Sequence, residues 1–179
     1  MNEVKAALTQ MHRAYAGYYK SLGQQPTTEY VEEWDAPCYV GEPSEGFIAW
    51  QAVEQEPAVD FANVEQALKM PLHESVKAFF SVYWAGDVDV LFQGHPITLL
   101  QVQLPEDADR LQQNLIGHVM MKQRLKQPVT LFIGVAAEDD LILTVNNETG
   151  TVGFEYVGKE QHEILTSDLA HFLQRVEPA

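Results

Sequence analysis

Basic residues are scarce in this sequence. The 179 residues include 11 lysines and arginines against 26 aspartates and glutamates, so the formal net charge at pH 7 is −15. Nucleic-acid binding depends on cationic side chains that displace counterions from the phosphate backbone. The composition therefore argues against direct nucleic-acid binding. With 46% hydrophobic and 10% aromatic residues, the chain still has enough apolar material for one folded core.

Cysteine and long hydrophobic runs are also nearly absent. Cys38 is the only cysteine, which excludes an intrachain disulfide. The longest apolar stretch, 129–137, is interrupted by Thr130 and Gly134 and is far shorter than the roughly 20 apolar residues needed to span a bilayer. The N-terminal residues lack the basic and apolar regions of a secretory signal. We expect a soluble protein of a reducing cytoplasm.

Motifs that carry chemistry are equally few. The sequence has neither a glycine-rich phosphate-binding loop nor a GxSxG elbow, and His73–Lys77 places a lysine where a zinc-protease helix needs its second histidine. We expect no cofactor and no metal. One weakly supported alternative is a metal-dependent hydrolase that uses Asp87 and Asp89, which share a strand face, with His118. A solvated strand face and a hydrogen-bonded helix histidine are the simpler interpretations.

Hydrophobic periodicity predicts an α+β fold in a single domain over residues 1–179. Apolar residues at steps of three and four from Val4 to Leu22 predict a helix that ends near Gly23. Strand-like segments occur mainly as hairpins, which favours a mostly antiparallel sheet packed with helices. Further helices are expected at 61–70, 72–84, 105–126 and 168–176, with Asp60 and Ser167 as caps, and strands at 38–40, 47–53, 87–92, 97–102, 129–135, 141–145 and 151–157, with hairpin turns at 43–46 and 93–96.

The negative charge is concentrated in residues 21–68, which we call the acidic block because it contains ten carboxylates and no Lys, Arg or His. Like charges gathered in this way repel one another and destabilise a fold unless something offsets the repulsion. One interpretation is a solvated surface that favours solubility. The other is a surface that docks a basic partner, with Trp34, Tyr39 or Trp50 as aromatic anchors. The acids of the block are Glu29, Glu32, Glu33, Asp35, Glu42, Glu45, Glu54, Glu56, Asp60 and Glu65.

Several short stretches are similar to a known family. They are Ala85–Asp87, Thr98–Gln101, Gln113–His118, Lys122–Leu125 and Thr130–Ile133. These stretches resemble the Syd family, the SecY-interacting proteins of Gram-negative bacteria, and the resemblance covers nearly the whole chain. It implies an α+β domain of the wider SUKH superfamily. It also implies a non-enzymatic protein that lies peripherally on the cytoplasmic side of the inner membrane and is also soluble in the cytoplasm.

The resemblance further implies a partner and a surface for it. In the Syd family, the basic cytosolic loops of the SecY translocon subunit are taken to dock against an acidic concave surface, and Syd is proposed to monitor or interfere with improperly assembled translocons. The wider superfamily implies an alternative, an immunity protein that neutralises a toxin by masking a basic surface. Our candidates for the partner-binding surface are Glu32, Glu33, Asp35, Asp87, Asp89, Glu106 and Asp107, with Trp34 and Trp50 as possible aromatic anchors.

Overall fold

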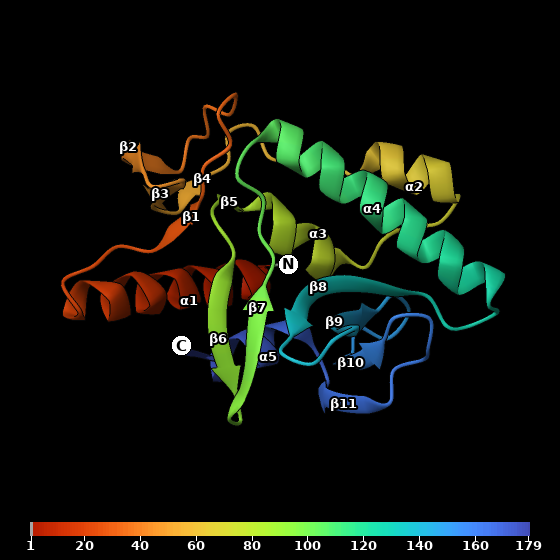
Figure 1. The fold of residues 1–179 in the computed structure, drawn as a ribbon. Helices are drawn as coiled ribbons and strands as arrows, with labels where there is room; N and C mark the ends of the chain where they lie inside the picture. Colours follow the sequence, from red (N-terminus) through yellow and green to blue (C-terminus); the bar gives the residue numbers. More distant parts are fainter. Residues whose placement is uncertain (1) are drawn as a thin grey trace.

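A computed structural model describes residues 2–179 of the chain (Figure 1). The described residues form helices and antiparallel sheets, so the predicted α+β class is confirmed. The amphipathic N-terminal helix and the long helix that begins at Pro105 are present as predicted. The helices are α1 (Asn2–Ser21), α2 (Ala62–Leu68), α3 (Glu74–Ser81), α4 (Pro105–Arg124) and α5 (Leu169–Arg175).

A seven-stranded antiparallel sheet forms the centre of the fold. Its strand order is β11-β10-β9-β8-β7-β6-β12, so most neighbours are hairpin partners in sequence. The turn between β6 and β7 contains only Gln93 and Gly94, both with positive φ, whereas we had predicted a turn over 93–96. Two residues with positive φ match the twist of the flanking strands, so pairing extends to His95. The strands are β6 (Val88–Phe92), β7 (His95–Leu99), β8 (Thr130–Ala136), β9 (Leu141–Asn146), β10 (Val152–Tyr156), β11 (Glu163–Thr166) and β12 (Glu177–Pro178).

A second, smaller sheet carries much of the acidic block. It has the order β1-β3-β2, and its hairpin turn consists of Glu45 and Gly46, both with positive φ. The sheet is fastened to the rest of the domain through Gln103. Tyr39 Oη donates to Gln103 Oε1 at 2.9 Å, and Gln103 Nε2 donates to Thr28 Oγ1 at 3.1 Å. The strands are β1 (Thr27–Glu29), β2 (Tyr39–Ser44) and β3 (Phe47–Trp50).

Two of the predicted helices are shorter than expected. The segment predicted as a helix over 72–84 is helical only in α3, and its last residues form β5 (Tyr83–Trp84), which pairs with β4 (Val53–Glu54). Helix α2 ends at Leu68 because Lys69 adopts a left-handed conformation. Asp60 does accept a hydrogen bond from the Ala62 N–H at 2.8 Å, at the start of α2.

The cap of the last helix also differs from the prediction. We had expected Ser167 to cap α5, but the Asp168 carboxylate accepts the His171 N–H at 2.8 Å. A carboxylate is favoured at this position because it faces the partial positive charge of the helix N-terminus. Helix α5 therefore starts one residue later than predicted.

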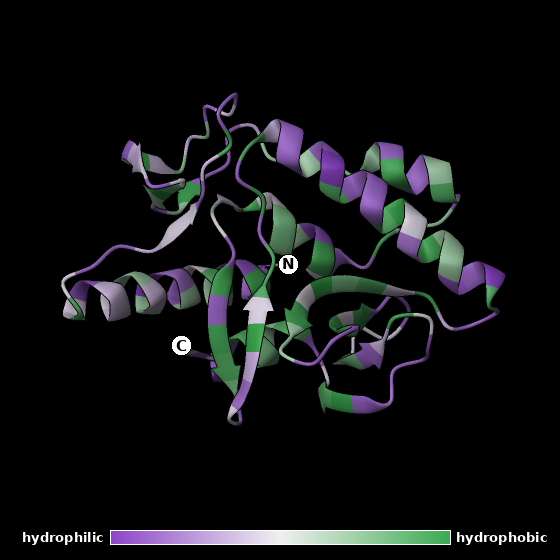
Figure 2. Cartoon of the chain, viewed as in Figure 1, coloured by the Kyte–Doolittle hydropathy of each residue, from purple (hydrophilic) through white to green (hydrophobic). Residues whose placement is uncertain are grey.

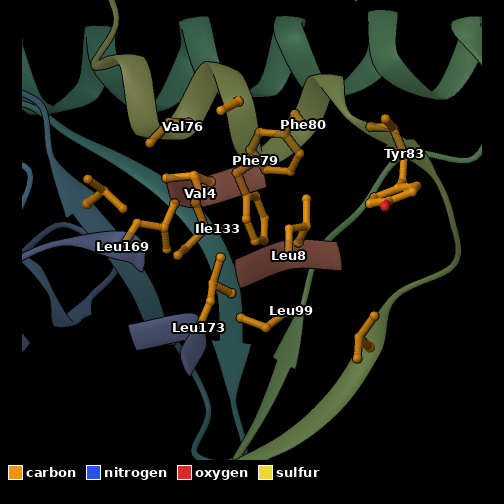
Figure 3. Close-up of a cluster of buried hydrophobic side chains, with 14 of the residues drawn as sticks. Val4, Leu8, Val76, Phe79, Phe80, Tyr83, Leu99, Ile133, Leu169 and Leu173 are labelled. Atoms are coloured by element: carbon orange, nitrogen blue, oxygen red, sulfur yellow. The ribbon is translucent and has the colours of Figure 1, made fainter. Parts of the chain in front are cut away.

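The hydrophobic core lies where α1, α3 and α5 pack together over the large sheet. In Figure 2 the apolar residues of α1 alternate with polar ones along the helix, as its periodicity predicted. Figure 3 shows side chains from the three helices meeting those of β7 and β8 in one cluster. The labelled members of this cluster are Val4, Leu8, Val76, Phe79, Phe80, Tyr83, Leu99, Ile133, Leu169 and Leu173.

Candidate acidic binding surface

The acidic block remains exposed after folding. Nine of its ten carboxylates belong to exposed residues, and the exception is the half-buried Glu65. Glu65 Oε2 lies 3.2 Å from Nζ of Lys77. Within residues 2–179, none of the other nine acids takes part in an ion pair. Folding therefore leaves their mutual repulsion in place.

The first turn of α4 is joined to the acidic block through Trp34. The guanidinium carbon of Arg110 lies 5.4 Å from the centre of the Trp34 ring, in cation–π contact. Arg110 Nη2 also donates to Asp107 Oδ1 at 2.7 Å, and Asp107 Oδ2 accepts the Gln103 N–H at 2.9 Å. Both oxygens of Asp107 are thus occupied, and the residue is only 7% exposed. Asp107 positions the start of α4, while its neighbour Glu106 is exposed.

A groove lies between the end of the acidic block and the N-terminal half of α4. Its volume is about 400 Å³, and three carboxylates, those of Glu56, Asp60 and Asp109, line it. Gln112 Nε2 closes one side by donating to the carbonyl oxygen of Asp60 at 3.0 Å. The remaining lining is mostly apolar and includes Pro37, Pro57, Ala58, Val59, Trp84, Pro105 and Ala108. We call this site the acidic groove.

The sequence-predicted acids fall into three groups. Glu32, Glu33 and Asp35 lie in the exposed loop that contains Trp34, and Glu106 is exposed beside the acidic groove. Asp107 is held inside by its hydrogen bonds, as described above. Asp87 lies directly before β6, and Asp89 lies within it.

Asp87 and Asp89 are each engaged by a different neighbour. Asp87 Oδ1 accepts the Gln101 N–H at 3.0 Å, and Asp89 Oδ1 accepts the Thr98 hydroxyl at 2.7 Å. Asp87 is exposed as a residue, yet desolvation of its carboxyl raises the pKa to about 6, and the negative charge of Asp107 adds to the rise. Because a pKa of about 6 still lies below 7, the carboxyl is mostly ionised at pH 7. Asp87 therefore contributes charge close to Asp107, whereas Asp89 belongs to the β6–β7 hairpin.

The aromatic residues predicted as anchors are largely covered in the fold. Trp50 is only 3% exposed and belongs to the core, so it is not available as an anchor for a protein partner; Trp34 is half-buried under Arg110. The exposed aromatic residue of the small sheet is Phe47, which is 50% exposed and pairs with Glu29 across the sheet. Alternation along β3 turns Ile48 and Trp50 inward and Phe47 outward. This period of two is the sequence signal that would have identified Phe47.

The residues of the metal-hydrolase alternative do not form one site. His118 Nε2 lies 3.0 Å from Thr130 Oγ1, and its ring edge contacts Phe132. Burial lowers the pKa of this histidine. In residues 2–179 no three His, Cys, Asp or Glu side chains are grouped closely enough to hold a metal ion. In the same part of the chain, no helix has the length and apolar character that a membrane crossing requires.

The fold and this surface define an α+β domain with an exposed acidic face and a small groove. The chain belongs to the Syd protein (SUKH-2) family, whose model matches residues 5–178. It is 47% identical over 152 residues to Protein Syd of Idiomarina loihiensis, covering 84% of this chain and 83% of the relative. It is 38% identical over 178 residues to Protein Syd of Pseudoalteromonas atlantica, covering 98% and 96%. For Protein Syd of Pseudoalteromonas translucida the identity is 39% over 172 residues, covering 95% and 96%.

Proposed function

We propose that this protein binds the basic cytosolic loops of the SecY translocon subunit through its acidic groove and the adjoining exposed acids of the acidic block. It thereby associates peripherally with the cytoplasmic side of the inner membrane and monitors or interferes with improperly assembled translocons, without catalysing a reaction. The observation that carries the proposal is a groove of about 400 Å³ lined by three carboxylates, two of which belong to the nine exposed acids of the acidic block that form no ion pair within residues 2–179. Membership of the Syd family supports the choice of partner.

The electrostatics of the groove suit a basic peptide loop. A cluster of carboxylates raises the local concentration of cationic partners and accelerates their association. The Debye length at physiological salt is about 8 Å, so this attraction acts at short range and weakens as salt is added. Association is also expected to relieve the repulsion within the acidic block, because lysine and arginine side chains would neutralise it.

The apolar lining of the acidic groove provides hydrophobic contact area for a partner, which the carboxylates do not provide. Trp84, Pro37 and Pro57 offer a surface for the aliphatic stems of lysine and arginine or for an apolar residue between them. Rim charges mainly set the association rate and the specificity, whereas a desolvated apolar centre mainly sets the lifetime of a complex. The site therefore fits a loop that carries cations around one or two apolar residues.

The test measures binding of the full chain to vesicles that contain SecY as the salt concentration rises. Two charge-reversal pairs, Glu32→Lys with Asp35→Lys and Asp60→Lys with Asp109→Lys, should each lower the affinity about tenfold or more and flatten its salt dependence. Glu148→Lys with Glu160→Lys changes the net charge by the same amount in turns of the large sheet and is the matched control. If the control pair weakens binding as much as the two test pairs, net charge alone acts and the groove is not the site.

A further inference from the structure

A second cavity, distinct from the acidic groove, lies between α1 and the segments at 24–26 and 50–52. Its volume is about 580 Å³. Aromatic side chains of His12, Tyr15, Trp50 and Tyr83 line it. The ring of His12 meets those of Trp50 and Tyr83 edge to face, with centroids 6.1 and 5.1 Å apart, and Tyr15 stacks on Trp50 at 6.0 Å. The cavity therefore has rigid aromatic walls that would accept a flat, apolar body.

One nitrogen of His12 has a hydrogen-bond partner, and this partner fixes the tautomer. Gln101 uses its amide nitrogen to donate to the carbonyl oxygens of Phe79 and Leu100, both at 3.1 Å. Its Oε1 atom is therefore an acceptor, and the neighbouring His12 Nε2, 3.1 Å away, must carry the hydrogen. The other ring nitrogen, Nδ1, is left as an acceptor.

His12 Nδ1 has no hydrogen-bond partner among residues 2–179. The residue is only 7% exposed, and burial lowers its pKa to about 4, so the ring is neutral at physiological pH. A buried acceptor without a partner is costly, and such groups in folded proteins usually meet a ligand, an ion or a water. Nδ1 itself has less than 1 Å² of accessible surface, so a ligand that completes this site has to present an N–H or O–H donor to it as the His12 ring turns towards the cavity.

Two cations that line the same cavity favour a negatively charged group on the ligand. Arg13 and Lys20 are seven positions apart on α1, so they lie on the same side of the helix, and both are exposed. Neither forms an ion pair with any residue of the described chain. In a protein with a net charge of −15, two unpaired cations at one cavity give it a local positive charge that attracts an anion.

We propose that this cavity binds a small aromatic anion, which places a hydroxyl or amine donor on His12 Nδ1 at one end and a carboxylate or phosphate near Arg13 and Lys20 at the other. The aromatic ring of the ligand lies against the side chains of Trp50 and Tyr83. This site does not depend on SecY binding, because its residues belong to neither the acidic groove nor the exposed acids of the acidic block.

The test uses the full chain and four small probes in isothermal titration calorimetry. 4-Hydroxyphenylacetate carries a carboxylate and 4-hydroxybenzylphosphonate a phosphate mimic, and the proposal expects at least one of them to bind. Phenylacetate lacks the hydroxyl and 4-methylphenol lacks the anion, so each should bind at least about tenfold more weakly than the bound hydroxylated anion. The ratio between the carboxylate and the phosphonate shows which anion the site prefers.

Two further measurements locate the bound probe. The Nδ1 resonance of His12 should shift on binding of the hydroxylated anion and not with phenylacetate, which has no donor for it. Arg13→Gln with Lys20→Gln should weaken binding about tenfold, whereas Lys5→Gln with Arg124→Gln removes the same charge outside the cavity and should leave binding unchanged. If none of the probes binds at millimolar concentration, or if phenylacetate binds as well as its hydroxylated analogue, the cavity holds water only and the proposal is overturned.

Discussion

The Nζ atom of Lys122 lies 2.9 Å from Oε2 of Glu155, and neither side chain is exposed to solvent. Lys122 also donates to the carbonyl oxygen of Lys159 at 2.8 Å, and Glu155 Oε1 accepts the Thr144 hydroxyl at 2.6 Å. The pair therefore fastens the last turns of α4 to the large sheet.

Breaking this buried pair should destabilise the protein strongly. Lys122→Met leaves the Glu155 carboxylate buried without a cation, and the expected loss is about 3–5 kcal/mol of unfolding free energy. Lys122→Met combined with Glu155→Gln removes both charges, so its loss should be smaller than that of Lys122→Met alone. Urea denaturation of the wild type, both single variants and the double variant gives the coupling energy directly.

A more exposed ion pair provides the control for this experiment. Lys77 lies 3.1 Å from Glu74 and 3.2 Å from Glu65, with its side chain 23% exposed. Lys77→Met should cost less than about 1 kcal/mol, because water already screens most of that interaction. Equal losses for Lys77→Met and Lys122→Met would contradict the structural importance assigned to the buried pair.

Gly86 is required because Trp50 lies directly against its backbone. A Cβ atom at position 86 would lie 2.5 Å from Nε1 of Trp50, which real contacts do not allow. Gly86→Ala should therefore displace the indole, cost about 1–3 kcal/mol and change the near-ultraviolet circular dichroism. Gly117→Ala is the matched control, since a Cβ there meets nothing within 4 Å. In the interior of α4 that change should stabilise the protein by about 0.5–1 kcal/mol.

His12 should make the stability depend on pH. Its pKa is about 4 in the folded protein and 6.5 in the unfolded chain, so between these values the unfolded chain binds more protons. The contribution of His12 to the unfolding free energy is therefore largest above pH 6.5. It decreases by about 3 kcal/mol in total as the pH falls towards 4. His12→Gln lacks this titration. The raised pKa of Asp87 acts in the opposite direction, but it is present in both proteins and cancels in their difference.

The measurement is the unfolding free energy of wild type minus that of His12→Gln, taken from urea titrations between pH 4 and 7.5. The difference should stay nearly constant down to about pH 6.5 and then fall as the pH approaches 4. A difference that stays constant with pH would mean that His12 is not buried as a neutral ring, and this would also remove the basis for its role as an acceptor in the aromatic cavity.

Local patterns were sufficient to predict the long elements of this fold. The periodic apolar residues of α1, the Pro105 start of α4 and the paired hairpins of the large sheet all depend on neighbours in sequence. The strand predicted over 47–53 is divided into β3 and β4, and β5 was missed, because Val53 pairs with Trp84 and a two-residue strand has no pattern of its own. In the same way, β11 and β12 form on the edges of a sheet whose other strands determine their register.

The two cavities could not be predicted for a related reason. The acidic groove joins Glu56 and Asp60 to Asp109, and the aromatic cavity joins α1 to Trp50 and Tyr83. The groove depends on how α4 packs beside residues 56–60, and the cavity depends on how α1 packs beside residues 24–26 and 50–52; composition specifies neither. The negative charge of the acidic block was visible in the sequence, but the engagement of Asp107 by Arg110 and Gln103 was not.

Phe47 should contribute to partner binding without contributing to stability. It is 50% exposed on the small sheet, and the acids Glu29 and Glu45 lie beside it. An exposed aromatic side chain within a charged surface is a typical anchor, and truncating such a residue commonly costs 1 kcal/mol or more of binding energy. Phe47→Ser should therefore lower the affinity for SecY-containing vesicles about tenfold and leave the urea midpoint unchanged. Ile164→Ser removes a 55% exposed apolar side chain from β11 at the edge of the large sheet, so it should change neither quantity. Equal effects of the two substitutions on affinity would show that general surface hydrophobicity, and not an anchor on the acidic side, holds the partner.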